Sequence, residues 1–205
     1  MSIVTLNDRG VRSVSNFGSL NTGSMIFIKK LTASSSATLS FVNGSSDVVL
    51  DSTYREYVFT FKDIHPGTDD ADTLMLGSVD GGSNYNAEAT SSFFQSFHEE
   101  DDSGADLGYL TSKDVQSGTG GVPIDHSVGN DNDQSSAGFL HLFNPASTTF
   151  IKHFISRINI SHASSNSQDM LVGGYFNTTS AINAIQFKKN TGNIDSWDIC
   201  LYGIL

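Results

Sequence analysis

The stretch KKNTGNIDSWDICLYGIL, residues 188–205, indicates which fold the chain adopts. Gly192-Asn193 predicts a tight turn, and the residues that follow alternate between the two sides of an extended strand. One side carries Trp197, Ile199, Leu201 and Gly203, and the other carries Cys200, Tyr202 and Ile204. A strand that is apolar on both sides belongs within a sandwich or under a neighbouring subunit, not at a free edge. The stretch therefore predicts a layered β structure that closes with an interior strand.

Further strands are predicted along the rest of the chain. The clearest is EYVFTFKDI at 56–64, where Tyr57, Phe59 and Phe61 share one side, and Pro66 then stops the strand because it cannot donate to a ladder. Other candidates are 24–31, 37–44, 72–82, 137–145, 148–160, 169–177 and 181–189, with weaker signals at 92–98 and 106–112. The pattern predicts an all-β, antiparallel, jelly-roll-like sandwich that forms a single domain over 1–205.

One segment between these strands is different in composition. Residues 113–136, KDVQSGTGGVPIDHSVGNDNDQSS, are crowded with Gly, Asp, Asn and Ser. Such residues favour turns and loops, and a loop of this length is unusual inside a compact domain. We therefore expect a long surface excursion at 113–136.

Charge and apolar content narrow the classes of partner. The chain has 11 Lys and Arg against 22 Asp and Glu, a net charge of −11, so it lacks the basic stripe that nucleic acid or an anionic membrane requires. No apolar run approaches the ~20 residues of a membrane span, and MSIVTLNDRG at the start lacks the apolar stretch of a signal peptide. We expect synthesis in a cytoplasm, and we expect the single Cys200 to be a small buried hydrophobe.

Motifs for catalysis or for a bound metal are weak. The sequence has no G-x-S-x-G, and SGTGG at 117–121 lacks the Lys of a phosphate loop, so no catalytic residue and no cofactor is predicted. From Asp131 the sixth residue is Ser136 and the twelfth is Leu142, which breaks the pattern of a calcium loop and leaves only a weak surface calcium site open. His141 and His153 lie on neighbouring candidate strands, either as a packed pair or as part of a metal site.

Exposed aromatic residues leave a binding function open. Aromatic side chains can stack on sugar rings, but in β-sandwiches most of them form the core. Tyr85 and Tyr109 fall in or near predicted loops, which makes them the candidate residues for a carbohydrate ligand. Tyr54, Tyr57, Tyr175 and Trp197 are the other aromatic residues considered.

An ordered series of stretches carries a resemblance across almost the whole chain. These are LNDRGVRSVSNFGSL, DSTYREYVFTFKDIHP, DGGSNYNAEATSSFF, GNDNDQSSAGFLHLFNPASTTFIKHFISR and GGYFNTTSAINAIQFKKNTGNIDSWDICLYGIL. Together they resemble a family of virion structural proteins of tailed phages that infect marine bacteria, above all cyanophages. The usual ending of that family resembles SGNID-x-G-x-I-x-LYGI. Here Trp197 replaces a small residue and Cys200 a polar one, which leaves the outer side of the last strand in doubt.

The resemblance implies a non-enzymatic protein of the virion with an all-β fold of jelly-roll type. It leaves three positions open: a decoration protein on the capsid surface, a compact tail or baseplate appendage, and a receptor-binding fibre or adhesin module that recognises a host surface glycan. Its partners would be other virion proteins and further copies of itself, and virion symmetry leads us to expect a trimer or another ring. A negative charge suits an outer surface more than a DNA-facing one.

Overall fold

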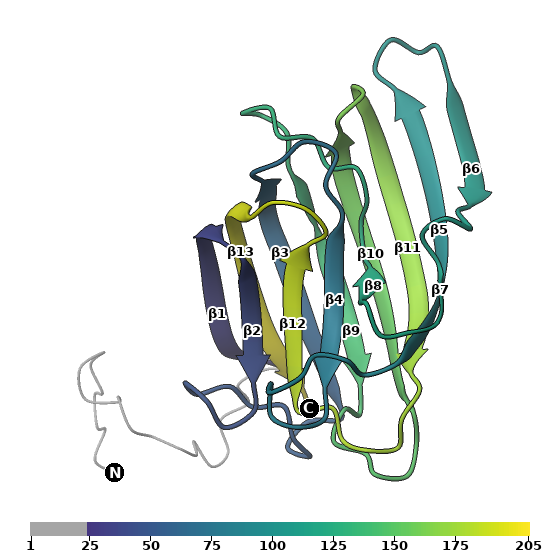
Figure 1. Ribbon diagram of the computed structural model, residues 1–205. Coiled ribbons are helices and arrows are strands. Elements are labelled where there is room, and N and C mark those ends of the chain that lie inside the picture. The colour runs from purple at the N-terminus through teal and green to yellow at the C-terminus, as the bar shows by residue number, and fades with distance from the viewer. Residues whose placement is uncertain (1–23) are drawn as a thin grey trace, which may run out of the picture.

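The computed structural model describes residues 24–205, in which every regular element is a β-strand (Figure 1). The stretch at 6–20 that contributes to the family resemblance, and the N-terminal segment MSIVTLNDRG, lie outside the described residues. Nine strands form a large sheet: β1 (Met25–Ser36), β13 (Ile194–Ile204), β3 (Glu56–Pro66), β9 (Ser136–Phe143), β10 (Lys152–His162), β11 (Asn166–Phe176), β5 (Ala89–Glu99), β6 (Ala105–Tyr109) and β7 (Val115–Gly118). Four form a small sheet: β2 (Thr38–Val42), β12 (Ala184–Lys189), β4 (Thr73–Ser78) and β8 (Val122–Pro123).

The two sheets pack face to face, and their connections are those of the predicted jelly roll. In the large sheet β1 pairs with β13 and β3 with β9, while in the small sheet β2 pairs with β12 and β4 with β8. The chain is therefore folded like one long antiparallel hairpin, and successive strands along each of its arms alternate between the large and the small sheet. In Figure 1 the small sheet stands in front of the large one. The all-β, antiparallel sandwich expected from the sequence is confirmed for the described residues.

Two insertions extend the large sheet beyond this jelly roll. β10 and β11 are inserted between β9 and β12, and β5, β6 and β7 between β4 and β8. β11 then pairs with β5 over the whole of both strands, which brings the two insertions into one continuous sheet. Figure 1 shows β5 and β6 reaching past the small sheet at the upper right. The weak strand signals at 92–98 and 106–112 correspond to β5 and β6.

Aromatic side chains dominate the space between the sheets. Phe59 contacts Phe41 and Phe187 edge to face, with ring centroids 5.3 Å apart in both pairs. Tyr57, Phe59 and Phe61 are all at most 2% exposed, as the period of two in 56–64 predicted. The strand continues to Pro66, which pairs with Ile194 as the last residue of β3, so proline ends the strand two residues later than expected.

The closing strand lies where its sequence predicted. β13 runs between β1 and β3, and its Trp197 packs in the core against Phe61 and Phe187. Cys200, on the opposite side of the strand, is 7% exposed and therefore buried as expected. Trp197 therefore lies on the inner side of the strand and Cys200 on the outer one.

The expectation of a surface excursion at 113–136 is wrong for its central part. Val122, Ile124 and Val128 have no exposed surface, and Val128 bridges Ala71 and His162. This segment covers the inner side of the inserted strands, which the small sheet does not reach. Because the insertions bury apolar side chains such as Phe93, some other part of the chain must cover them, and a loop with alternating apolar residues does so.

Candidate interaction surface

The outer face of the large sheet, its side turned away from the small sheet, carries most of the exposed large apolar side chains. Eight of the eleven found in residues 24–205 lie on it, while Val79, Phe150 and Leu205 lie in loops or at the end of the chain. The eight are Met25, Phe27, Phe94, Leu107, Tyr109, Phe139, Ile155 and Leu171, and they are between 39% and 75% exposed. Single exposed apolar residues are normal on a protein surface, but a continuous group marks an interaction site.

Strand register places six of these eight side chains in two adjacent rows, with Met25 and Leu107 in the rows on either side of them. One row crosses from β1 to β5 through Phe27, Tyr202, Val58, His141, Ile155, Gly173 and Ser92. The next crosses from β13 to β6 through Cys200, Thr60, Phe139, Arg157, Leu171, Phe94 and Tyr109. Residues opposite one another in antiparallel strands lie about 5 Å apart, so each row is a line of contacts. The rings of Phe94 and Tyr109 meet edge to face at 5.1 Å.

Charged side chains on the outer face are held in pairs between neighbouring strands. Arg157 donates through Nη2 to Asp169 Oδ2 at 2.7 Å and through Nε to both carboxylate oxygens at 3.1 Å. Lys30 donates to one oxygen of Asp198, and Thr32 Oγ1 donates to the other at 2.6 Å. The hydrogen bond from Lys30, followed by that from Thr32, lowers the pKa of the Asp198 carboxyl. Lys62 stands opposite Asp198 as a further cation, and Glu56 is hydrogen-bonded to His141, so the outer face carries no surplus of either charge.

The surplus of carboxylates lies in loops at the ends of the strands. Acidic residues cluster at 69–70 after β3, at 99–102 between β5 and β6, and at 131–133 between β8 and β9. Within residues 24–205 no group of three or more His, Cys, Asp or Glu side chains is placed to hold a metal ion. The weak calcium site considered at Asp131 therefore has no coordinating cluster among the described residues.

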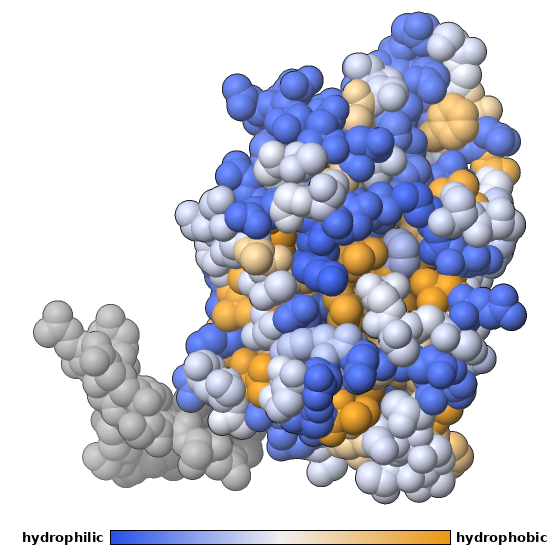
Figure 2. Space-filling model, in the orientation of Figure 1, coloured by the Kyte–Doolittle hydropathy of each residue, from blue (hydrophilic) through white to orange (hydrophobic). Residues whose placement is uncertain are grey.

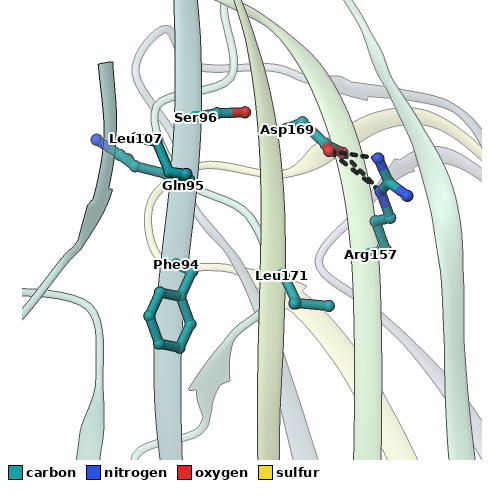
Figure 3. Close-up of a pocket in the computed structure, with 7 residues that line it drawn as sticks. All are labelled: Phe94, Gln95, Ser96, Leu107, Arg157, Asp169 and Leu171. Atoms are coloured by element: carbon teal, nitrogen blue, oxygen red, sulfur yellow. Dashed lines mark hydrogen bonds and ion pairs between the residues drawn. The ribbon is translucent and has the colours of Figure 1, made fainter.

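Two hollows indent the outer face over the inserted strands. The first, about 330 Å³, is lined by Phe94, Gln95, Ser96, Leu107, Arg157, Asp169 and Leu171. In Figure 3 the Phe94 ring lies across the hollow from the joined Arg157 and Asp169, with Leu171 between the ring and Arg157. The second, about 520 Å³, is lined by Ile155, Gly173 and Tyr175 among others. It exists because Gly173 has no side chain: a Cβ there would meet only Ser92 Oγ, at 3.9 Å.

The two tyrosines singled out in the sequence lie in different places. Tyr109 is on the outer face at the edge strand β6, where it packs on Phe94 and donates to Asp114 Oδ2 at 2.6 Å. Tyr85 is in the loop between β4 and β5 and lies next to Gly82, close to Val42 of the small sheet. Tyr109 therefore borders the first hollow, whereas Tyr85 lies in a loop beside the small sheet.

No hydrogen bond or ring contact joins His141 and His153, the two histidines considered as a pair. His141 is hydrogen-bonded to Glu56 through Nδ1 and stacks on Phe143. His153 packs on Tyr175, with ring centroids 5.8 Å apart. The two histidines lie on the neighbouring strands β9 and β10, as the sequence predicted. Both are on the outer face, and each has its own partner.

A buried polar network fixes the covering segment 113–128 to the two sheets. Asp125, which is fully buried, accepts hydrogen bonds from Thr73 N at 2.6 Å and Thr73 Oγ1 at 2.7 Å. Lys189 Nζ donates to the same hydroxyl at 2.8 Å, and its burial lowers the pKa of the ammonium group despite the nearby Asp125. Lys113 Nζ binds Asp72 Oδ2 at 2.6 Å. These contacts tie the segment to β4 and β12.

His126 closes this network toward the inserted strands. Its Nε2–H donates to Gln95 Oε1 at 2.5 Å, and its ring packs on Phe93. Burial, followed by the positive charge of Lys113, lowers the pKa of His126 to about 4. The imidazole is therefore neutral at pH 7. The network holds the segment in place, and Gln95 is its one member that also lines a hollow of the outer face.

Sequence reasoning missed the outer face as a unit. It recognised that β13 is apolar on both sides, but it did not extend that reading to β10 and β11. Ile155 and Leu171 stand at outward positions of strands whose inward positions, such as Ile158 and Val172, are also apolar. That double apolar pattern is the signal that could have identified the face.

Comparisons of the chain with protein-family models, with curated proteins and with solved structures gave no match. In the part of the chain that the structure describes, no helix is long and apolar enough to cross a membrane.

Proposed function

We propose that this chain is a non-enzymatic structural protein of a tailed-phage virion, either a decoration protein of the capsid surface or a compact appendage of the tail or baseplate. The observation that carries the proposal is the outer face, where eight half-exposed large apolar side chains gather on a nine-stranded sheet. A sheet face with so many exposed apolar side chains is suited to contact with another protein.

Two further observations support a place on the outside of a particle. The surplus of acidic residues lies in loops at the strand ends, which leaves those ends hydrated and mutually repelling. The polar residues buried under 113–128 hold the fold together through hydrogen bonds within the chain. The order of sequence stretches that resembles marine phage virion proteins points to the same role.

The proposal is tested on purified particles of the phage that encodes the chain. We expect mass spectrometry to find the protein in particles banded by density, and a membrane-impermeant amine reagent to label it in intact particles. Lys188, on an outward position of β12 in the small sheet, is an accessible target. Absence from washed particles would overturn the proposal, and complete protection from the reagent would overturn the outward position.

A second candidate function is recognition of a host surface glycan. The observation that favours it is the first hollow, which is lined by the Phe94 ring and by the polar groups of Asp169 and Arg157, with Tyr109 packed on Phe94. Sugar binding sites combine an aromatic platform with polar groups of this kind. Binding on a glycan array that is lost in Phe94→Ala and kept in Tyr85→Phe would support it.

A further inference from the structure

We infer that the outer face of the large sheet is the contact between two copies of this chain, packed sheet against sheet about a twofold axis. The inference rests on the proposed function, because it names the partner through which a virion protein of this kind would assemble. Four properties of the face favour a second copy as the occupant: its area, its charge, its shape and the position of Cys200.

The area is sufficient for a stable dimer. At roughly 200 Å² for each fully exposed large side chain, the eight half-exposed residues present about 800 Å² of apolar surface, close to the roughly 800 Å² per partner of a standard interface. The two rows together run across the sheet from β1 to β6, with polar residues such as Thr60, His141 and Arg157 among the apolar ones.

Because the outer face has no surplus of charge, it favours a partner whose contact surface also has no surplus of charge. A basic protein would be the natural partner of a chain with a net charge of −11, and it would dock where the acidic residues gather. On the outer face, however, Arg157 is paired with Asp169 and Lys30 with Asp198. The acidic loops lie at the strand ends, outside the face. A second copy of the same face offers apolar surface without a surplus of either charge, and so meets this requirement.

The shape of the face is self-complementary. Leu171 and Phe94 project from one row, while Gly173 leaves a hollow of about 520 Å³ in the next. A twofold axis lets the projecting side chains of each copy enter the hollow of the other, because in such an interface residue i contacts j and j contacts i. Two sheets stack face to face at about 10 Å, the distance that side chains of this size fill. We therefore expect a twofold dimer in place of a threefold ring.

Position Cys200 agrees with this arrangement. It stands on the outer face of β13, between Lys30 and Thr60, and is 7% exposed. A small hydrophobe at this outward position adds no polar group that a covering partner would have to satisfy.

The test measures the mass of the full chain by light scattering and sedimentation over a concentration series. We expect a species of twice 22.0 kDa. In Leu171→Glu, which places two unpaired carboxylates in the contact, we expect the dimer dissociation constant to rise by about 100-fold. The matched control is Val79→Glu, which removes a similarly exposed aliphatic side chain (39% against 49%) and adds the same charge in the loop after β4. We expect that control to remain a dimer.

A second variant separates specific packing from general stickiness. Gly173→Leu adds an apolar group at a position where the monomer has free space, so we expect the monomer to keep its fold and its melting temperature. If two copies pack into the hollow, the added side chain blocks them and weakens the dimer. If association were unspecific, the larger apolar surface would strengthen it, and that result would overturn the inference.

The remaining outcomes are equally distinct. A wild-type chain that stays monomeric throughout the series would overturn the inference, including the case in which another particle protein binds the face. A trimer would overturn the twofold arrangement. A dimer broken by Leu171→Glu, found together with absence of the protein from particles, would refute the proposed function and leave this contact in place.

Discussion

The two outer surfaces of the sandwich differ in how the chain treats their apolar positions. On the small sheet, β2 and β12 turn Ser40 and Gln186 outward, joined by a hydrogen bond of 3.0 Å. Leu76 of β4 would be exposed there, but the loop at Gly121 lies over it and leaves it 6% exposed. Figure 2, which views this side, shows mostly hydrophilic and intermediate residues with smaller apolar areas between them. The outer face of the large sheet has no such cover among the described residues.

The difference shows which sheet faces the chain covers with its own residues. Segment 113–128 covers the inner side of the inserted strands, and its loop at Gly121 covers part of β4. The chain thus uses its own residues for three of its four sheet faces. The fourth retains eight half-exposed large side chains, whose desolvation is left to another molecule. The following predictions test this contrast, from the largest effect to the smallest.

Truncation after Gly192 should abolish soluble folding. It removes β13, which lies between β1 and β3 and places Trp197, Ile199 and Leu201 in the core. Without β13 the large sheet loses the strand between β1 and β3, and the core between the two sheets loses these three side chains. Solubility and circular dichroism of the truncated chain measure the effect, with deletion of Leu205 alone, which is 77% exposed, as the control. A soluble truncation with the β spectrum of the full chain would contradict it.

Substitutions on the inner and outer sides of the large sheet should differ strongly. Phe59→Ala removes a fully buried ring that contacts Phe41 and Phe187, and should lower the free energy of unfolding by about 3–5 kcal/mol. Phe139→Ala, at a position 39% exposed on the outer face, should lower it by less than about 1.5 kcal/mol in the monomer. Urea denaturation at low protein concentration compares them, and equal losses would argue that Phe139 belongs to the core.

Acid should weaken the cover formed by 113–128. The pKa of His126 falls from 6.5 in the unfolded chain to about 4 in the folded protein, because burial disfavours the charged ring. Between these values the unfolded chain binds a proton that the folded protein does not, so stability falls as pH drops below 6.5 and levels off below about 4. The loss attributable to this group is at most about 3 kcal/mol.

The measurement for this prediction is the melting temperature between pH 7 and pH 4. His126→Gln should be somewhat less stable at neutral pH but should show a smaller decrease on acidification, since the titrating group is gone. His153→Gln, on the outer face, serves as the matched control and should decrease like the wild type. If His126→Gln follows the same pH dependence as the wild type, the assignment to His126 is wrong.

Changes on the outer side of the small sheet should have the smallest effect. Gln186→Lys lies beside Ser40 and exchanges one polar group for another on a surface that is already solvated. We expect a change in unfolding free energy within about 0.5 kcal/mol and no change in the mass of the oligomer. Dissociation of the dimer in this variant would show that the small sheet, and not the outer face, forms the contact.

Local patterns in the sequence were enough for the strands and the sandwich. The period of two at 56–64 and the doubly apolar strand at 194–204 depend only on neighbouring residues, and both strands formed with the expected sides buried. The turn at Gly192-Asn193 is equally local: Gly192 has a φ of 68°, which glycine adopts without strain. These features follow from the alternation of side chains along an extended chain and from turn chemistry.

Tertiary structure decided the rest. Residues 113–136 have the composition of a loop, and only the insertion of β5, β10 and β11 creates an uncovered sheet that Ile124 and Val128 can bury themselves against. The outer face likewise arises when register aligns Phe94, Leu171 and Phe139 from strands far apart in the sequence. A sequence determines which side of its own strand a residue takes, but which residues become neighbours across a sheet depends on strand order, and that order is set by the packing of the whole chain.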